Sequence, residues 1–174
     1  MEQAEWMLYP LRVRYQETDA MGVVYHANYL TWFEIGRTEL IRSKGYAYGR
    51  IEQEGLMLPL TDLDSQFRQP ARYDDAIVVC TRVESFTPMR VGFRYQIRRL
   101  ASASAEAALP ALGEGTVRAA REDGEGLPGE LLAGGGTRHV WVDRGFRPAR
   151  LDRRLPELYE LIRRMAPGGK EERA

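Results

Sequence analysis

Cysteine is almost absent from this sequence: Cys80 is the only one in 174 residues, so the chain can form no internal disulfide. A lone thiol inside an apolar run is more often a small core residue than a nucleophile. Histidine is equally scarce, with His26 and His139 as the two copies, so a zinc site of histidine and cysteine ligands is not expected. The pattern GxxxxGK[ST] does not occur, which excludes a nucleotide-phosphate loop of that type. We therefore expect no metal and no bound cofactor.

Long apolar runs are missing too. No stretch of about 18 apolar residues occurs, so no membrane insertion is expected. Glu2 and Glu5 interrupt the N-terminus, which does not resemble a signal peptide. The 25 basic and 25 acidic residues cancel, and nucleic-acid binding would need a net basic surface. These absences predict a cytoplasmic protein that binds neither nucleic acid nor membrane.

The composition that remains is that of an ordinary globular domain, with 44% hydrophobic residues. We expect residues 1–155 to form a single domain, interrupted by a long excursion at 101–129 that is rich in Ala, Gly, Glu and Ser. Residues 156–174 are predicted to form a C-terminal helix, with proline in its first turn at Pro156, and a loose tail.

Periodicity predicts one buried helix and a series of strands. Apolar residues at helical spacing run from Tyr29 to about Lys44, with Asn28 as the expected N-cap and Gly45 as the C-terminal cap. Alternating patterns predict strands at residues 8–14, 57–69, 76–86, 90–100 and 130–143. Three glycines, 134–136, suggest a bend or bulge in the last of these. One helix followed by a run of strands predicts an α+β fold, with an antiparallel sheet wrapped on that helix.

Reactive side chains concentrate in residues 15–29. This stretch contains Asp19 and His26, and a strand is expected to lead into it and a helix to leave it. A helix start presents free N–H groups and the positive end of the helix dipole, which suits a site that stabilises an oxyanion. Asp19 could equally be a turn residue, and Glu17 is expected to be solvated or paired rather than catalytic. His139 falls in an expected strand and is interpreted as structural.

Residues 18–29, TDAMGVVYHANY, resemble the signature of hotdog-fold acyl-CoA thioesterases of the 4-hydroxybenzoyl-CoA thioesterase type. The sequence is most similar to the branch of bacterial short-chain acyl-CoA thioesterases linked to the Tol-Pal system. The resemblance continues through Glu34, Arg37 and Gly45, through residues 67–71, and into 139–143. The excursion at 101–129 departs from the pattern, since members of the family lack it or keep it short.

The resemblance implies a sheet of about five strands around one long central helix. It also implies a homodimer or homotetramer with the active site at the dimer interface and acyl-CoA as the substrate. Asp19 falls on the family's catalytic aspartate, and the N–H groups around His26 fall where the family polarises the thioester carbonyl. CoA phosphates would need a cationic rim, and two tyrosines are candidates for the acyl pocket. The residues expected to bind substrate or shape its site are Tyr15, Gly22, Tyr25, Asn28, Glu34, Arg68 and Arg90.

Several alternatives stay open at this level. Asp19 could attack the thioester carbonyl itself or activate a water, and His26 could assist as a base or merely line the site. Glu34 could belong to a structural ion pair or to the site. A hydratase or dehydratase of the same fold would also pair a carboxylate with a histidine. A non-catalytic acyl-CoA binding protein is the third possibility.

Overall fold

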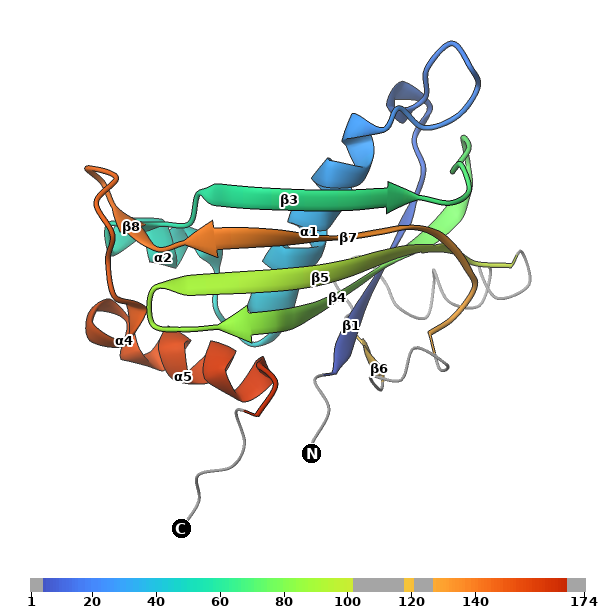
Figure 1. The fold of residues 1–174 in the computed structure, drawn as a ribbon. Helices are drawn as coiled ribbons and strands as arrows, with labels where there is room; N and C mark the ends of the chain where they lie inside the picture. Colours follow the sequence, from blue (N-terminus) through green and yellow to red (C-terminus); the bar gives the residue numbers. More distant parts are fainter. Residues whose placement is uncertain (1–4, 102–117, 121–126, 169–174) are drawn as a thin grey trace.

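A computed structural model describes residues 5–101, 118–120 and 127–168. Its central feature is one twisted antiparallel sheet with a long helix across one face (Figure 1). Within the described residues, no helix combines the length and the apolar character needed to cross a bilayer.

Six strands form this sheet, in the order β3-β7-β5-β4-β1-β6, and every neighbouring pair is antiparallel. The strands are β1 (Trp6–Arg12), β3 (Leu60–Phe67), β4 (Ala76–Phe86), β5 (Arg90–Arg99), β6 (Arg118–Ala120) and β7 (Glu130–Val140). The expected α+β class and antiparallel sheet are confirmed. The sheet has six strands because β6, a short strand within the excursion, adds to the free edge of β1. The expectations for residues 102–117 and 121–126 lie outside the described residues.

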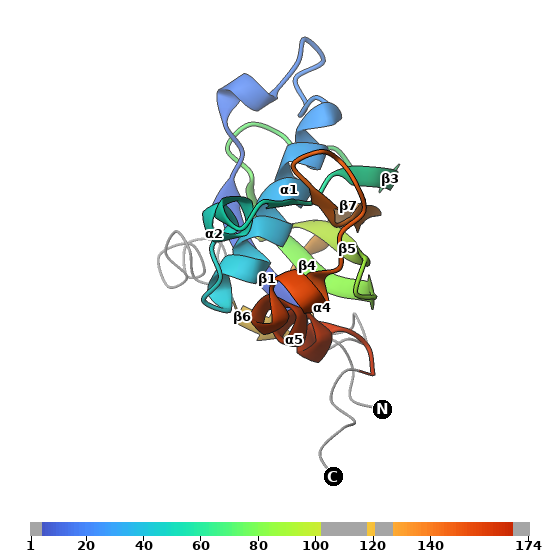
Figure 2. The same ribbon diagram turned by 90° about the vertical axis from the view of Figure 1, so that its left-hand side faces the viewer.

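The long helix α1 (Ala27–Ser43) lies against the sheet, as Figures 1 and 2 show from two directions. Its apolar residues recur every three or four positions, so they share the face that the sheet covers. The Phe33 ring stacks on Tyr95, with ring centroids 4.4 Å apart. Gly36 allows the close approach to β4, because a Cβ there would come within 2.3 Å of Thr81 Oγ1. A sheet curved around one such helix is the hotdog architecture that the resemblance implies.

Of the two predicted caps of α1, the C-terminal one is confirmed and the N-terminal one is wrong. Gly45 follows the helix at φ +86°, and its N–H bonds Arg42 O, so the predicted C-terminal cap is confirmed. The predicted N-cap is wrong: the helix begins at Ala27, with His26 as N-cap. Asn28 lies inside the first turn, where its N–H donates to Tyr25 O and its side-chain Nδ2 donates to Glu17 O at 2.7 Å. The side chain of Asn28 therefore serves as a donor to the loop, through Nδ2, and not as the acceptor that a helix cap requires.

Two strand expectations also need correction. The predicted strand 57–69 is divided at residues 58–59 into β2 (Leu56–Met57), which pairs with β8 (Val142–Asp143) in a separate two-stranded sheet, and β3. The predicted bulge at glycines 134–136 is wrong, because β7 keeps a regular register there and shifts instead opposite Ile97 and Arg98. Gly135 serves packing, since a Cβ on it would lie 2.2 Å from Asp64 O and 3.1 Å from the Phe33 ring.

The described residues also form three shorter α-helices, α2 (Tyr48–Gln53), α4 (Leu151–Arg154) and α5 (Pro156–Met165), and a 3-10 turn at residues 15–17. The α5 bounds match the predicted C-terminal helix, and its Leu158 and Ile162 are buried in the same core as α1. Residues 169–174, expected to be a loose tail, lie outside the described residues.

A chain of buried polar groups crosses the sheet face beneath α1. Tyr95 Oη lies 2.8 Å from Thr137 Oγ1, which lies 2.9 Å from His139 Nε2, and His139 Nδ1 lies 3.3 Å from Leu58 O. Burial lowers the pKa of His139 to about 4, so its ring is neutral at pH 7. A neutral ring whose two nitrogens both have hydrogen-bond partners fits the structural role expected for this histidine.

Candidate functional site

Asp19 begins a tight turn on the loop that precedes α1. Its carboxylate Oδ1 accepts the N–H of Met21 at 2.8 Å, and its carbonyl accepts the N–H of Gly22 at 3.0 Å. Gly22 has φ +73°, a left-handed conformation that favours glycine, and nothing lies within 4 Å of a Cβ placed there. The second carboxylate oxygen, Oδ2, has no hydrogen-bond partner within the described part of the chain. The turn thus holds Asp19 by one oxygen and leaves the other available.

A short ladder ties this turn to the entrance of the helix. Thr18 and Val24 form an antiparallel bridge, and the Asp19 N–H donates to Val23 O at 2.9 Å. One step further out, the Tyr25 N–H donates to Glu17 O at 2.9 Å. These bonds hold the carboxylate beside the segment that leads into α1.

The helix start supplies unpaired N–H groups. Asn28 and Tyr29 donate to Tyr25 O and His26 O. The N–H groups of His26 and Ala27 have no acceptor among the described residues. The aligned peptide dipoles add about half a positive charge at this end of a helix. Together these groups can bind an anionic oxygen next to the Asp19 turn.

Aromatic rings surround His26. The imidazole is exposed, with its centroid 4.4 Å from the Tyr25 ring and 6.5 Å from that of Phe67, which in turn lies 5.2 Å from Tyr29. Tyr25 remains 47% exposed. Phe67 lies at the end of β3, so a distant strand contributes a wall that the loop sequence alone did not indicate.

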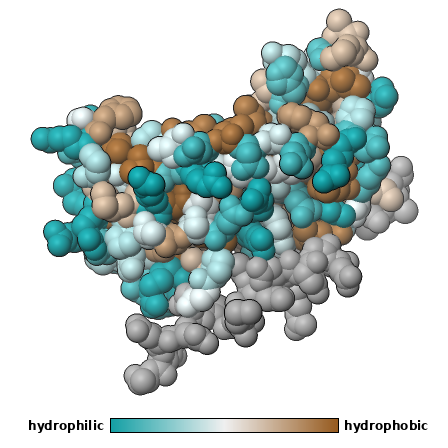
Figure 3. All heavy atoms as spheres, viewed as in Figure 1, coloured by the Kyte–Doolittle hydropathy of each residue, from teal (hydrophilic) through white to brown (hydrophobic). Residues whose placement is uncertain are grey.

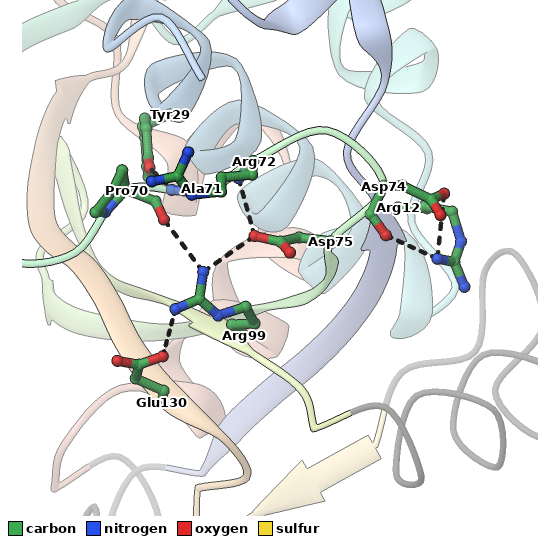
Figure 4. A network of polar contacts seen from close by, with 9 residues as sticks. All are labelled: Arg12, Tyr29, Pro70, Ala71, Arg72, Asp74, Asp75, Arg99 and Glu130. Atoms are coloured by element: carbon green, nitrogen blue, oxygen red, sulfur yellow. Dashed lines mark hydrogen bonds and ion pairs between the residues drawn. The ribbon is translucent and has the colours of Figure 1, made fainter. Parts of the chain in front are cut away.

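The segment that follows β3 is hydrogen-bonded, through Ala71, to the loop and to the first turn of α1. The N–H of Ala71 donates to Tyr29 Oη at 2.9 Å, while its carbonyl accepts the Val24 N–H at 2.8 Å. Burial raises the pKa of Tyr29. In Figure 4 the Arg99 guanidinium bridges the Asp75 and Glu130 carboxylates and also reaches the Pro70 carbonyl. This network anchors the base of the site, and no local sequence signal indicated it.

Tyr15, an expected substrate-binding residue, projects from the same loop with 76% of its side chain exposed. Its ring makes an edge-to-face contact with Tyr73, with centroids 5.6 Å apart. Met21 is similarly exposed. The loop therefore presents Tyr15 and Met21 to solvent. Figure 3 shows tan and brown atoms, the colours of apolar residues, at the upper right of the molecule.

Two of the expected site residues, Glu34 and Arg90, are not brought to this loop within one chain. Glu34 is exposed on α1, about 10 Å along the axis from Ala27, where the helix begins. Arg68 lies beside Leu132 at one end of β7, whereas Arg90 pairs with Val140 at the other, about 27 Å away along the strand. A cationic rim that contains both arginines cannot form within a single subunit.

The described residues contain no group of three or more histidine, cysteine, aspartate or glutamate side chains that could hold a metal ion. The ionisable groups of the loop, residues 15–26, are Tyr15, Glu17, Asp19, Tyr25 and His26. The arrangement therefore offers a carboxylate, an imidazole and helix-start N–H groups for chemistry at a carbonyl.

Comparison with known proteins shows which family this chain is similar to. Residues 13–158 match the Thioesterase-like superfamily. A Bacillus subtilis protein named putative acyl-CoA thioesterase YneP is 41% identical over 87 residues, which cover 50% of this chain and 63% of that protein. An Escherichia coli protein named acyl-CoA thioester hydrolase YbgC is 33% identical over 89 residues, covering 51% of this chain and 66% of that protein.

The chain thus spans just under two thirds of the length of either relative. Among solved structures, a DHNA-CoA thioesterase from Staphylococcus aureus superimposes with a TM-score of 0.71 at 29% identity, covering 92% of each chain. The family match covers most of this sequence, and the structural match extends across the same fold. The chain belongs to the thioesterase-like superfamily of hotdog-fold proteins.

Proposed function

We propose that this protein is an acyl-CoA thioesterase, which hydrolyses an acyl-CoA to a carboxylic acid and CoA. The observation that carries the proposal is that one loop presents both the Asp19 carboxylate and the N–H groups of His26 and Ala27, which have no acceptor among the described residues. The names of the B. subtilis and E. coli relatives support the same activity.

Hydrolysis of a thioester passes through a tetrahedral intermediate whose carbonyl oxygen carries negative charge. In the proposed reaction the N–H groups of His26 and Ala27 donate to that oxygen. A single donor of this kind contributes about 3 kcal/mol of transition-state stabilisation. The thiolate of CoA then leaves as the C–S bond breaks.

Asp19 acts in this proposal either as nucleophile or as general base. As nucleophile, its carboxylate attacks the carbonyl carbon to form a mixed anhydride, which water hydrolyses to the acid and the regenerated aspartate. As base, it takes the proton of the water that attacks directly. The His26 imidazole lies next to the same helix start and can orient that water.

The other loop residues shape the site. Tyr15 and Tyr25 are proposed to contact the acyl group, since both rings are exposed beside the helix start. Gly22 allows the turn and leaves space for the thioester, because no atom lies near its Cα on the side-chain side. Asn28 fixes the loop through its bond to Glu17 O rather than capping the helix.

We infer that two copies associate along β3. This strand forms one edge of the sheet, and every residue of it except Ser65 is exposed. Its exposed apolar side chains include Leu60, Leu63 and Phe67, and Leu30 of α1 is exposed as well. Figure 3 shows apolar atoms along the upper rim, above β3. An open edge with such side chains is a template for pairing with another chain.

Antiparallel pairing of β3 with its copy would place the Leu60 end of one subunit beside the Phe67 end of the other. Arg90 lies near the first end and Arg68 near the second, so the CoA phosphates could meet both arginines only across the interface. Glu34 is proposed to face this interface rather than the thioester. Further assembly to a tetramer, the cytoplasmic location and the Tol-Pal link remain predictions.

Thiol release from short, long and aromatic acyl-CoAs tests the activity. We expect stoichiometric CoA and acid from at least one of these substrates, at a rate proportional to enzyme concentration. Loss of enoyl-CoA absorbance without thiol release would instead indicate a hydratase. Binding of acyl-CoA without turnover, at high enzyme concentration, would indicate a non-catalytic binding protein.

Replacing Leu63 with arginine is expected to separate the subunits. An unpaired charge buried at an interface costs about 3–5 kcal/mol, so dimer affinity should fall at least about a hundredfold. Sedimentation equilibrium measures this, with Gln66→Lys as the matched control because Gln66 lies on the opposite face of β3. A wild-type monomer, or an unchanged Leu63→Arg dimer, would contradict pairing through β3.

A further inference from the structure

Glu17, in the short 3-10 turn η1 (Tyr15–Glu17), carries more hydrogen bonds than any other residue of the loop. Its carboxylate accepts the Trp32 indole N–H at 2.9 Å through Oε1 and the Arg14 N–H at 2.7 Å through Oε2. Its backbone carbonyl accepts the Tyr25 N–H at 2.9 Å and the Asn28 Nδ2 at 2.7 Å. Two of these bonds connect Glu17 to α1, at Trp32 and Asn28, and a third connects it to Tyr25, two residues before the helix.

Glu17 lies between the two parts of the candidate site, the Asp19 turn and the start of α1. Asp19 follows Glu17 by two residues. Tyr25, which is hydrogen-bonded to Glu17, directly precedes His26 and Ala27, whose N–H groups have no acceptor among the described residues. Trp32 is fully buried on the sheet side of α1, so its indole is a fixed reference point. A carboxylate bonded to that indole sets how far the Asp19 turn stands from the helix end.

Burial of an indole does not by itself require such a partner here. The Nε1 atoms of Trp6 and Trp141 are also buried, and neither has a hydrogen-bond acceptor in the described part of the chain. Among the described residues, a carboxylate acceptor is therefore not a general requirement of a buried indole in this fold. Only at Trp32 does a carboxylate accept the indole N–H, and no lysine or arginine of the described residues forms an ion pair with that carboxylate.

We propose that Glu17 is a positioning residue for thioester hydrolysis, holding the Asp19 carboxylate at its working distance from the N–H groups of His26 and Ala27. The proposal rests on the proposed thioesterase function. Glu17 does not touch the substrate. It acts through the loop, so its loss should impair the chemical step for every acyl group and leave substrate binding nearly unchanged.

Glu17→Gln and Trp32→Phe test this from the two ends of one bond. The glutamine has a single acceptor oxygen for two N–H donors, and the phenylalanine keeps an aromatic ring but lacks the donor. A displacement of about 1 Å at a reacting group costs about a hundredfold in rate. We expect each variant to lower kcat about 10- to 100-fold with KM changed less than about twofold. The double variant should be no slower than the slower single variant.

Trp141→Phe is the matched control, because it removes a buried indole N–H that has no hydrogen-bond acceptor among the described residues. Its kcat should stay at the wild-type value. Assays run well below each variant's Tm, and circular dichroism gives the folded fraction. The Trp32 indole N–H resonance should also move upfield in Glu17→Gln, which reports the bond without any activity.

The outcomes separate the two proposals. If the wild type hydrolyses acyl-CoA while Glu17→Gln and Trp32→Phe keep wild-type kcat per folded molecule, Glu17 is only structural and the inference is wrong. A rise in KM with no change in kcat would overturn the inference as well. If the wild type releases no thiol from any acyl-CoA, the proposed function itself fails, and with it the role that this inference assigns to Glu17.

Discussion

Asp19→Asn is expected to lower kcat for acyl-CoA hydrolysis by at least about a hundredfold, because a positioned general base typically contributes about 10² to 10⁴ to the rate. The substitution is a mild one for the structure. The asparagine Oδ1 can still accept the Met21 N–H, and the Gly22 N–H bonds a backbone carbonyl, so the turn should persist. What disappears is the negative charge, and with it both attack on the carbonyl and proton abstraction from water.

Thiol release under saturating acyl-CoA measures the effect, with Asp19→Ala as the stronger variant and Asp152→Asn as control. Asp152 lies in α4 and pairs with Arg150, so its replacement removes a carboxylate without touching the loop. The control should keep wild-type kcat. Asp19→Asn within about tenfold of the wild type would show that another group performs the chemistry, since residual catalysis by N–H donors alone is far weaker.

Gly135→Ala is expected to destabilise the fold by about 3 kcal/mol or more, at the upper end of the cost of overpacking a core. The added methyl carbon would stand 2.2 Å from the Asp64 carbonyl and 3.1 Å from both the Phe33 ring and the Ser65 Cα. Two of these three neighbours are backbone atoms of β3, which cannot turn away as a flexible side chain can. Relief requires β3 to separate from β7 or α1 to lift from the sheet.

The neighbouring glycine provides the control for this prediction. At Gly134 the nearest atom to an added Cβ is the Tyr95 carbonyl at 3.4 Å, and the side chain would point to the other face of the sheet. Urea unfolding of the two alanine variants should therefore give a clear loss for residue 135 and a change within about 1 kcal/mol for residue 134. Equal losses would indicate that strand propensity, and not contact with α1, sets the cost.

Local patterns predicted most of the elements for identifiable reasons. The spacing of Phe33, Leu40 and Ile41 indicated α1, and the bounds of α5 followed from Pro156 and its apolar stripe. The strands β4 and β5 and the short link between them followed from alternation. Each of these patterns arises from neighbours within a few residues, which the sequence displays directly.

The failures share a different cause. Asn28 looked like a helix cap, but the Glu17 carbonyl, eleven positions earlier, takes its amide. Glycines 134–136 looked like a bulge, but Gly135 is small because α1 and β3 approach it. A residue type compatible with several local roles receives its actual one from a partner that is distant in sequence, and periodicity contains no information about that partner.

Taken alone, the sequence determined the α+β class, the helix and strand order, and the loop on which Asp19, Gly22 and His26 stand, because these depend on residue type and short-range spacing. Tertiary structure alone decided which groups surround that loop. It placed Phe67 against His26, fastened Ala71 to Tyr29, and separated Arg68 from Arg90 by the length of β7. Side chains far apart in the chain meet only when the sheet has formed and α1 has packed on it, so the surroundings of the site are a property of the fold.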